Sequence, residues 1–271
     1  LESHVGESMG DWYTYTWMKD DAGNYIVGEN GLYIADKSER HKVGNAMPKF
    51  TGGFGTSLSY KNFTLDVAFD FRIGGDVLNL PWQYMMSAGN ITDAVGVRDH
   101  STGGVYYYSD TEDVSDKASI HVLTPDQVGA YKRGETMFNG HYVWDNGLIL
   151  PGVKEDGTPN DIVVTQFEAN DNHYGWGTGA SQSYADAIQE NTYIKCREIS
   201  LGYTFPVALT KKFACNRLTL SAFVRNPFYI YRTLKLFDSE TSDATNWIYQ
   251  AQVGGSTASA RTFGFSLRAS F

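Results

Sequence analysis

The sequence predicts an all-β protein that crosses a membrane, on three observations: its composition, its long alternating segments and the lengths of its connections. Of 271 residues, 14% are aromatic, 28 are glycine and 20% are charged, against about 25% charged in a typical soluble domain. Aromatic residues are enriched in strands, and turns favour glycine. The net charge of −9 argues against nucleic-acid binding, because phosphates need a patch of lysine and arginine.

Several classes of protein are excluded by what the sequence lacks. No stretch approaches the roughly 18 apolar residues of a transmembrane helix, and no nucleotide-binding, zinc-protease or nucleophile-elbow motif is present. The polar opening at 1–4 predicts no signal peptide, and the chain begins as if cut from a longer one. Cys196 and Cys215 lack metal-ligand spacing, and we expect them to be unpaired because strand geometry holds them too far apart.

Two neighbouring segments, 50–60 and 63–73, show the strongest alternation. Successive side chains of a strand point to opposite faces, so alternation predicts a strand between two unlike environments. The second segment alternates without a fault over eleven residues. That length suits a tilted membrane-spanning strand of roughly 9–11 residues better than a globular strand of about 5–6. Its apolar residues are Phe63, Leu65, Val67, Phe69, Phe71 and Ile73.

Four further segments carry the same pattern. We expect strands near 192–205, 217–226 and 261–271, and a weaker candidate near 12–17. Helix is expected only locally, for example over 125–132, where the preceding threonine is a suitable cap.

The connections between these strands alternate strictly between short and long. Lys61 and Asn62 form one short turn and 206–216 the other, whereas 18–49, 74–191 and 227–260 are long. A compact soluble domain has no need for a structureless loop of more than a hundred residues. Outer-membrane barrels do combine short periplasmic turns with long extracellular loops. The sequence therefore predicts a transmembrane antiparallel β-barrel in the outer membrane of a Gram-negative bacterium, in contact with its lipid.

The alternation also assigns the two faces of each strand. Apolar positions are expected to meet lipid, and polar positions to line the lumen. Lys195 and Arg197 share the parity of the lipid-facing residues but lie near the upper strand end, where a charge costs little. Phe271, an aromatic C-terminus on the final strand, is expected to be the assembly signal. The predicted lumen-facing residues are Asp66, Asp70, Arg72, Glu198 and Arg225.

Two other classes of protein stay open at this point. Acidity and abundant aromatic residues also suit a soluble carbohydrate-binding β-sandwich or a glycoside hydrolase, although such a fold has shorter strands and loops of modest length. A passive porin would share the alternation and the loop pattern.

Several motifs resemble those of SusC-like TonB-dependent transporters. They span about 48–271 in the order and spacing of that family, with Cys196 at a common leucine and Ser239 at a common proline. The motifs are PKFTGGF at 48–54, SYKNFTL at 59–65, GVKEDGTPN at 152–160, YIKCREISLGYTFP at 193–206, RNP at 225–227 and DSE at 238–240.

This resemblance implies more than the residues do by themselves. It implies a 22-stranded barrel of which this chain supplies the last five or six strands, with the N-terminal plug and the TonB-contacting segment outside the chain. It implies import of oligosaccharides or peptides, energised through the TonB complex. A SusD-like surface lipoprotein is the implied partner, capping the barrel and delivering the ligand.

The long loops hold the candidate substrate contacts, because flat aromatic rings stack on sugar rings. The candidates are Trp144, Trp176, Tyr174, Tyr107 and Trp247. They are equally suited to holding long loops together. Glu155 and Asp156 are expected to lie in a solvated loop, and the segment 20–24 to form a turn rather than a calcium site. We expect no catalytic residue, no cofactor and no metal.

Overall fold

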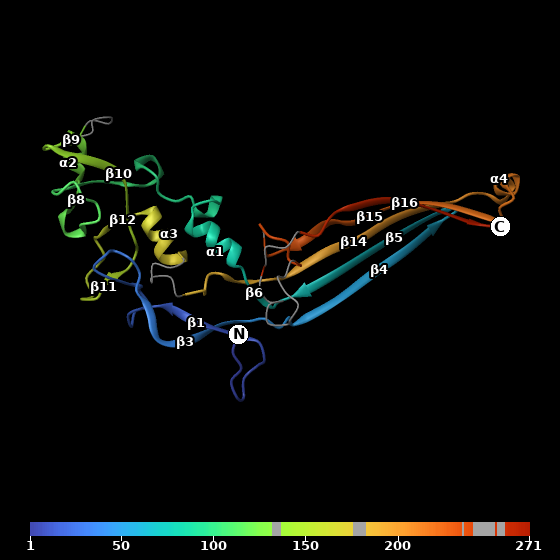
Figure 1. The fold of residues 1–271 in the computed structure, drawn as a ribbon, viewed down its shortest axis with the longest axis horizontal. Helices are drawn as coiled ribbons and strands as arrows, with labels where there is room; N and C mark the ends of the chain where they lie inside the picture. Colours follow the sequence, from blue (N-terminus) through green and yellow to red (C-terminus); the bar gives the residue numbers. More distant parts are fainter. Residues whose placement is uncertain (132–136, 176–182, 235, 241–252, 254–257) are drawn as a thin grey trace. The chain divides into compact units, whose positions relative to one another are not determined.

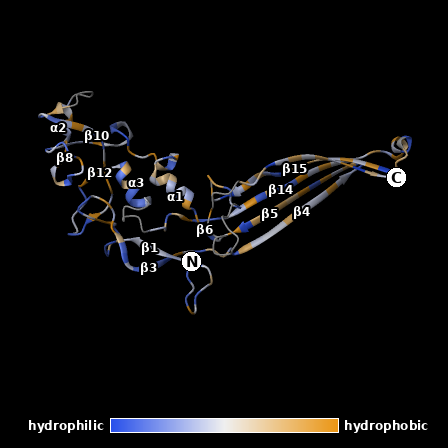
Figure 2. Cartoon of the chain, viewed as in Figure 1, coloured by the Kyte–Doolittle hydropathy of each residue, from blue (hydrophilic) through white to orange (hydrophobic). Residues whose placement is uncertain are grey.

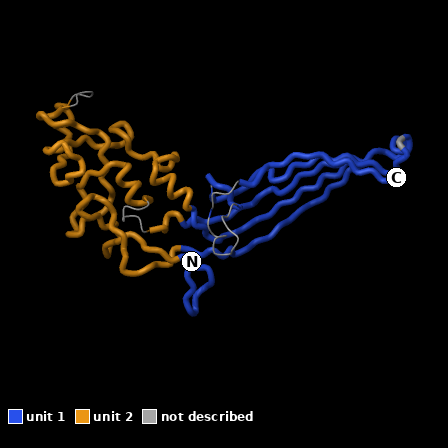
Figure 3. The backbone as a smooth tube through the Cα atoms, in the orientation of Figure 1, with its two compact units in different colours: residues 1–12, 44–79, 188–271 blue, residues 13–43, 80–187 orange. Residues whose placement is uncertain are grey.

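The computed structural model describes residues 1–131, 137–175, 183–234, 236–240, 253 and 258–271. The chain forms two compact units, each assembled from segments that are far apart in the sequence (Figure 3). Unit 1 consists of Leu1–Trp12, Gly44–Asn79 and Ile188–Phe271. Unit 2 consists of Tyr13–Val43 and Leu80–Ala187.

Unit 1 is built on a five-stranded antiparallel sheet in the order β16-β15-β14-β5-β4 (Figure 1). The strands β4 and β5 have the predicted bounds, and they pair residue by residue around a tight turn at Lys61, whose φ is 53°. Both edge strands, β4 and β16, pair on one side only among the described residues. The strands are β4 (Phe50–Tyr60), β5 (Phe63–Ile73), β14 (Tyr193–Thr204), β15 (Arg217–Arg232) and β16 (Thr262–Ser270).

The fourth strand in sequence order, β15, runs six residues beyond the predicted end at 226. Its pairing with β14 shifts register twice, between Arg225 and Phe228 and between Tyr229 and Tyr231. Each bulge adds a residue to β15 and interrupts its alternation, so the sequence pattern fades while the strand continues. The short turn between β14 and β15 holds α4 (Val207–Thr210) and the 3-10 helix η4 (Lys211–Phe213).

A small cluster packs where β5, β14 and β15 end. Two short strands, β6 (Asp76–Leu78) and β13 (Ile188–Glu190), pair antiparallel there. Val77 forms a buried cluster with Leu234 and Val253, against which Phe237 packs. This cluster holds the segment after β15 close to the end of the sheet.

The predicted strand near 12–17 is present as β1 (Asp11–Trp17), but it does not belong to the five-stranded sheet. It pairs with β3 (Ala35–Asn45), which lies inside the predicted loop 18–49. The assignment of β1 to the barrel is therefore wrong. Asp11, Trp12 and Thr14 are all buried, so both faces of β1 are covered, unlike those of a strand between lipid and lumen.

Unit 2 holds a second sheet, in the order β12-β10-β7-β8, with β9 paired to β10. Its main cluster consists of Tyr106, Leu123 and Val143. Most of the predicted loop 74–191 thus folds around a core of its own. The strands of this sheet are β7 (Val105–Ser109), β8 (Ile120–Val122), β9 (Met137–Phe138), β10 (His141–Ile149) and β12 (Val163–Thr165). The strands β2 (Ile26–Val27) and β11 (Val153–Lys154) of unit 2 lie outside this sheet.

Two helices in unit 2, α2 (Pro125–Ala130) and α3 (Gln166–Tyr174), begin at capping boxes. In α3, Thr165 and Glu168 form the capping box, and in α2 Thr124 and Gln127 do the same. The predicted helix at 125 is confirmed as α2. The remaining helices are α1 (Leu80–Ser87) and the 3-10 turns η1 (Thr92–Ala94), η2 (His100–Thr102) and η3 (Lys117–Ser119).

In the described part of the chain, no helix is both long enough and apolar enough to cross a membrane.

Candidate functional site

One face of the five-stranded sheet is apolar and exposed. Cross-strand partners share a face, so the register aligns Phe54 with Phe69, and Val67 with Ile199. The apolar row continues through Phe265, which is 82% exposed. Figure 2 shows apolar residues alternating with polar ones along these strands. Large apolar side chains on a monomer surface are normally scattered, so a continuous face indicates an environment other than water.

The opposite face of the same sheet is polar and carries the charges. All five predicted lumen-facing residues lie on this face: Asp66, Asp70, Arg72, Glu198 and Arg225. Glu198 accepts a hydrogen bond from Arg225 Nε at 2.8 Å across the β14–β15 pair. Arg72 instead donates to the backbone carbonyls of Gly74 and Ala46. That this polar face lines a lumen stays a prediction.

A β-bulge in β14 changes the predicted orientation of two cations. Cys196 pairs with Phe69 and Glu198 with Ala68, so Arg197 is the extra residue. The bulge reverses the parity of everything before it, and Lys195 consequently pairs with Asp70 on the polar face. The expectation that Lys195 and Arg197 lie on the lipid-facing side is wrong for this reason.

These two cations converge on one carboxylate, that of Glu240. Arg197 donates to both carboxylate oxygens, with Nη1 at 2.7 Å from Oε2, and also donates to Asp70. Lys195 donates to the same carboxylate and to Ser259 Oγ at 2.9 Å. The Lys195 side chain is only 2% exposed, so it depends on this partner: a buried charge without one costs several kcal/mol, roughly 3–5.

The segment that carries Glu240 is held to the strands by a second carboxylate, Asp238. Tyr229 donates its hydroxyl proton to Asp238, and the Ser259 backbone N–H donates at 2.6 Å. Burial raises the pKa of Asp238, but the hydrogen bonds from Ser259 and Tyr229 outweigh it and bring the pKa to about 2. Burial likewise raises the pKa of Glu240, and hydrogen bonds from Arg197 and Lys195 outweigh it, so this pKa lies below its usual value.

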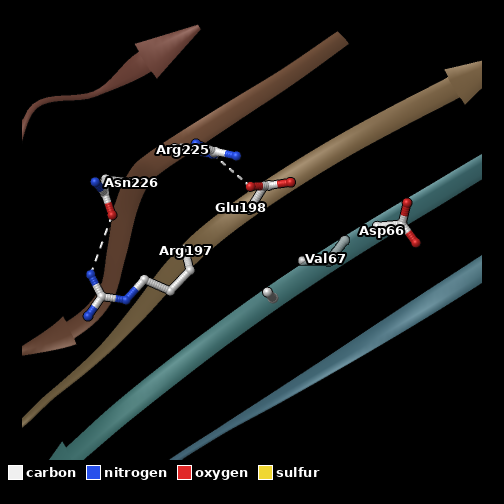
Figure 4. Close-up of a pocket in the computed structure, with 7 residues that line it drawn as sticks. Asp66, Val67, Arg197, Glu198, Arg225 and Asn226 are labelled. Carbon is white, nitrogen blue, oxygen red and sulfur yellow. Dashed lines mark hydrogen bonds and ion pairs between the residues drawn. The ribbon is translucent and has the colours of Figure 1, made fainter. Parts of the chain in front are cut away.

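A cavity of about 480 Å³ adjoins this ion-pair cluster on the polar face (Figure 4). Arg197 is common to both and reaches toward Asn226, whose amide oxygen lies 3.4 Å from Nη1. The lining residues are Asp66, Val67, Ala68, Arg197, Glu198, Arg225 and Asn226. The lining thus combines two guanidinium groups with two carboxylates, and none of these described lining residues is aromatic.

The predicted substrate contacts are not brought together at this cavity. Tyr107 is 1% exposed and stacks on Trp144 at 5.7 Å between ring centroids, and burial raises the pKa of Tyr107 to about 12. The prediction that Tyr107 contacts substrate is wrong, because its ring is part of the core of unit 2. Tyr174 packs edge-on against Trp82 at 5.3 Å, and burial raises its pKa to about 12.

The remaining sequence predictions for sites have simple outcomes. Trp176 and Trp247 lie outside the described residues. Among the described residues, neither Cys196 nor Cys215 forms a disulfide, as predicted. Asp20 accepts hydrogen bonds from the backbone N–H groups of Ala22 and Asn24, which confirms a turn at 20–24. Among the described residues, no group of three or more histidine, cysteine or acidic side chains is arranged to hold a metal ion.

Sequence reasoning missed the Glu240 cluster, although a signal for it was present. Two cations in the lipid-facing parity of an otherwise apolar row contradict that row. The contradiction indicates a change of register in β14. The matching irregularity on the neighbouring strand lies at Asn226–Pro227, where Asn226 has a φ of 51°.

Comparison with known proteins finds similarity to TonB-dependent receptors. Receptor P39 of Formosa agariphila is 24% identical over 204 residues, which cover 74% of this chain and 14% of that protein. Receptor P3 of the same organism is 27% identical over 92 residues, covering 27% of this chain and 9% of that protein. The chain therefore spans less than a sixth of these curated relatives. No protein-family profile matches it.

Among solved structures, two of the RagAB system align with the chain. One is described as a peptide importer in the open-open state, with a TM-score of 0.44 and 11% identity. The alignment covers 100% of this chain and 24% of the chain in that structure. The other, described as a peptide transporter, has a TM-score of 0.44 and 12% identity, over 96% and 23%.

Proposed function

We propose that this chain forms the last strands of the barrel of a SusC-like, TonB-dependent outer-membrane transporter that imports oligosaccharides or peptides. The observation that carries the proposal is the two-faced sheet of unit 1, with an exposed apolar face opposite a charged one. Lipid gives the apolar face the environment that the described residues do not supply. The charges then line the lumen, where water solvates them.

The dimensions of the strands fit this proposal. Eleven residues in β5 at ~3.3 Å each span about 36 Å, which a tilt of ~45° reduces to about 25 Å. An outer-membrane barrel has an apolar band about 25 Å tall. The Tyr203 ring contacts Phe63 at 4.8 Å and Phe205 at 5.1 Å near the short-turn end of the strands. That is where an aromatic girdle is expected.

In this proposal the remaining parts of the transporter come from outside the chain. The other strands, the plug and the TonB-contacting segment complete the barrel and couple it to the TonB complex. Unit 2 lies on the extracellular side and meets a SusD-like surface lipoprotein that delivers the ligand. Trp144 and Tyr174 of unit 2 stay candidates for ligand contact, and Phe271, which is 81% exposed, stays the candidate assembly signal.

The alternatives make different demands on the same sheet. A soluble sandwich or glycoside hydrolase needs a second sheet against the apolar face, and the described residues of unit 1 form only the short β6–β13 pair besides the main sheet. A passive porin shares the sheet and differs in needing no energy. The similarity to TonB-dependent receptors supports the energised transporter.

Adjacent arginine substitutions in β4 test the barrel. Thr56 pairs with Val67 on the apolar face, and Ser57 pairs with Asp66 on the polar face. In the full-length protein, Thr56→Arg should reduce the heat-modifiable, membrane-inserted fraction, because arginine in the lipid-facing band costs about 2–4 kcal/mol near its middle. Ser57→Arg should insert normally. Equal insertion of both variants would contradict a lipid-facing parity.

Energy coupling needs its own experiment. Ligand uptake should stop when TonB is deleted, while the barrel still inserts. Uptake that continues without TonB would identify a passive porin instead.

A further inference from the structure

We propose that the polar face holds a carboxylate-binding site centred on Arg197, which Glu240 of the same chain occupies and which a carboxylate-bearing ligand in the adjoining cavity takes over. The inference rests on the proposed function only in that a ligand must reach this face. It assigns a ligand chemistry to Arg197 and Lys195 of the motif at 193–206, and it makes Glu240 of the motif at 238–240 an exchangeable internal occupant.

The site has the geometry of carboxylate recognition. Arg197 donates two parallel hydrogen bonds to the two oxygens of Glu240, the bidentate arrangement in which guanidinium binds carboxylate most strongly. Lys195 donates a third, and the Tyr193 hydroxyl lies 3.5 Å from Oε1. Two cations two positions apart on β14, turned to the polar face by one bulge, thus contact a single carboxylate.

Glu240 is the replaceable member of this cluster. Arg197 and Lys195 are fixed on a central strand of the sheet, whereas Glu240 belongs to the segment after β15. That segment keeps other attachments: Asn191 Nδ2 donates to the Ser239 carbonyl at 2.8 Å, and Tyr229 of β15 donates to Asp238. Loss of the Glu240 contacts therefore does not require the whole segment to leave.

The cavity gives a ligand access to Arg197. Its guanidinium side chain is 34% exposed and lines the cavity, whereas Lys195 is almost completely buried. Arg225 lines the same cavity, donates its Nε to Glu198, lies 5.1 Å from the Phe223 ring centroid, and has a side chain that is 60% exposed. A carboxylate entering the cavity therefore meets two guanidinium groups.

The shared chemistry is a carboxylate, from an acidic peptide or from a uronic-acid oligosaccharide. The test uses the intact full-length protein in detergent and titrates it with triglutamate, trigalacturonate and neutral maltotriose by calorimetry. One or both acidic ligands should bind, and which of them does identifies the source. Binding of maltotriose with the same affinity as the two acidic ligands would overturn the proposal.

Three variants, with a fourth in reserve, decide whether Glu240 competes with the ligand for Arg197. Glu240→Gln should raise the affinity for the acidic ligand about tenfold, because the occupant no longer carries a charge. Glu39→Gln removes one negative charge from an exposed position of β3, outside the cavity lining, and should change the affinity by less than about threefold. Arg197→Gln should abolish binding. Where Glu240→Gln fails to insert, Glu240→Asp retains the charge on a shorter side chain and should raise the affinity in the same direction.

Hydrogen exchange supplies a readout that a purely structural ion pair would not produce. The Glu240 backbone N–H donates to Asp238 at 3.2 Å in the occupied state. Adding the acidic ligand should speed exchange at 239–240 in the wild type and have no further effect in Glu240→Gln. Unchanged affinity in correctly inserted Glu240 variants would overturn the site alone, whereas failure of the wild type to insert would overturn the proposed function.

Discussion

The two main sheets of this chain use the same kinds of side chain in opposite ways. In unit 2, consecutive residues are buried, such as Val163 with Val164 and Tyr106 with Tyr107, so both faces of the sheet are covered by the chain itself. In unit 1, by contrast, every residue of the edge strand β4 is exposed, whether large and apolar or small and polar. Strict alternation over long strands thus indicates a sheet whose second environment lies outside the chain.

The largest effect is expected where the chain covers its own aromatic residues. Tyr107→Ala should cost about 3–5 kcal/mol of unit 2 stability, because it removes a fully buried ring from between Trp144 and the surrounding core. Hydrogen exchange of β7 and β10 in the full-length protein measures this loss. Phe265→Ala on β16 is the control and should leave exchange in unit 2 unchanged. A loss below about 1 kcal/mol for Tyr107→Ala would contradict the packed core.

A charge in the apolar row of β5 should have the next largest effect. Val67→Arg is expected to cost about 2–4 kcal/mol of folding into lipid vesicles, because Val67 lies near the middle of the strand. Urea titration of vesicle-inserted protein gives the number. Val67→Leu keeps the apolar surface and should fold like the wild type. If both variants fold equally well, the apolar face does not meet lipid.

The cap of α3 contributes a smaller amount. Thr165 Oγ1 accepts from the Glu168 backbone N–H at 3.2 Å, and the Glu168 carboxylate accepts from the Thr165 N–H at 2.7 Å. Thr165→Ala should lower unit 2 stability by about 1 kcal/mol, whereas Thr165→Ser retains the hydroxyl and should have little effect. Chemical denaturation followed by near-ultraviolet circular dichroism distinguishes them. Indistinguishable curves for the two variants would argue against the cap.

The smallest of the expected effects is that of acid, which weakens the attachment made by Asp238. Its folded pKa of about 2 lies below the usual 3.8, so its stabilising contribution is complete above about pH 4 and is lost as the pH falls towards 2. Solvent screening keeps this contribution near 1 kcal/mol. Pulsed hydrogen exchange at 236–240 and 258–260 should show faster opening between pH 4 and 2 in the wild type. Asp238→Asn should remove part of that pH dependence, and the Glu240 carboxylate, whose pKa is also lowered, should supply the rest.

The sequence predicted the parts of the fold that depend on local periodicity. The bounds of β4 and β5 coincide with the predicted ones, since nothing interrupts their pairing from Tyr60 and Phe63 to Phe50 and Ile73. The bulge at Arg197 left a weaker signal, two cations in an apolar row, and its exact position became clear only from the pairing of β14 with β5. Its effect is large, since it moves Lys195 from one face of the sheet to the other.

Tertiary contacts decided what periodicity left undetermined. Alternation near 12–17 is genuine, but Asp11 and Thr14 are buried, and the strand pairs with β3 rather than with β4. The fold of unit 2 depends on contacts between 13–43 and 80–187, segments too distant in sequence for a local pattern to connect. Glu240 reaches Lys195 across 45 positions and was equally beyond local inference.

The open edges of the five-stranded sheet have a consequence for how this part of the chain is handled in a cell or a test tube. β4 and β16 each present a row of backbone N–H and C=O groups with no partner strand among the described residues. Such rows template the addition of further strands, whatever chain supplies them. Residues 1–271 produced in isolation should therefore join edge to edge into oligomers whose size grows with concentration. A chaperone that holds outer-membrane proteins before insertion has these two edges to shield, as well as the apolar face between them.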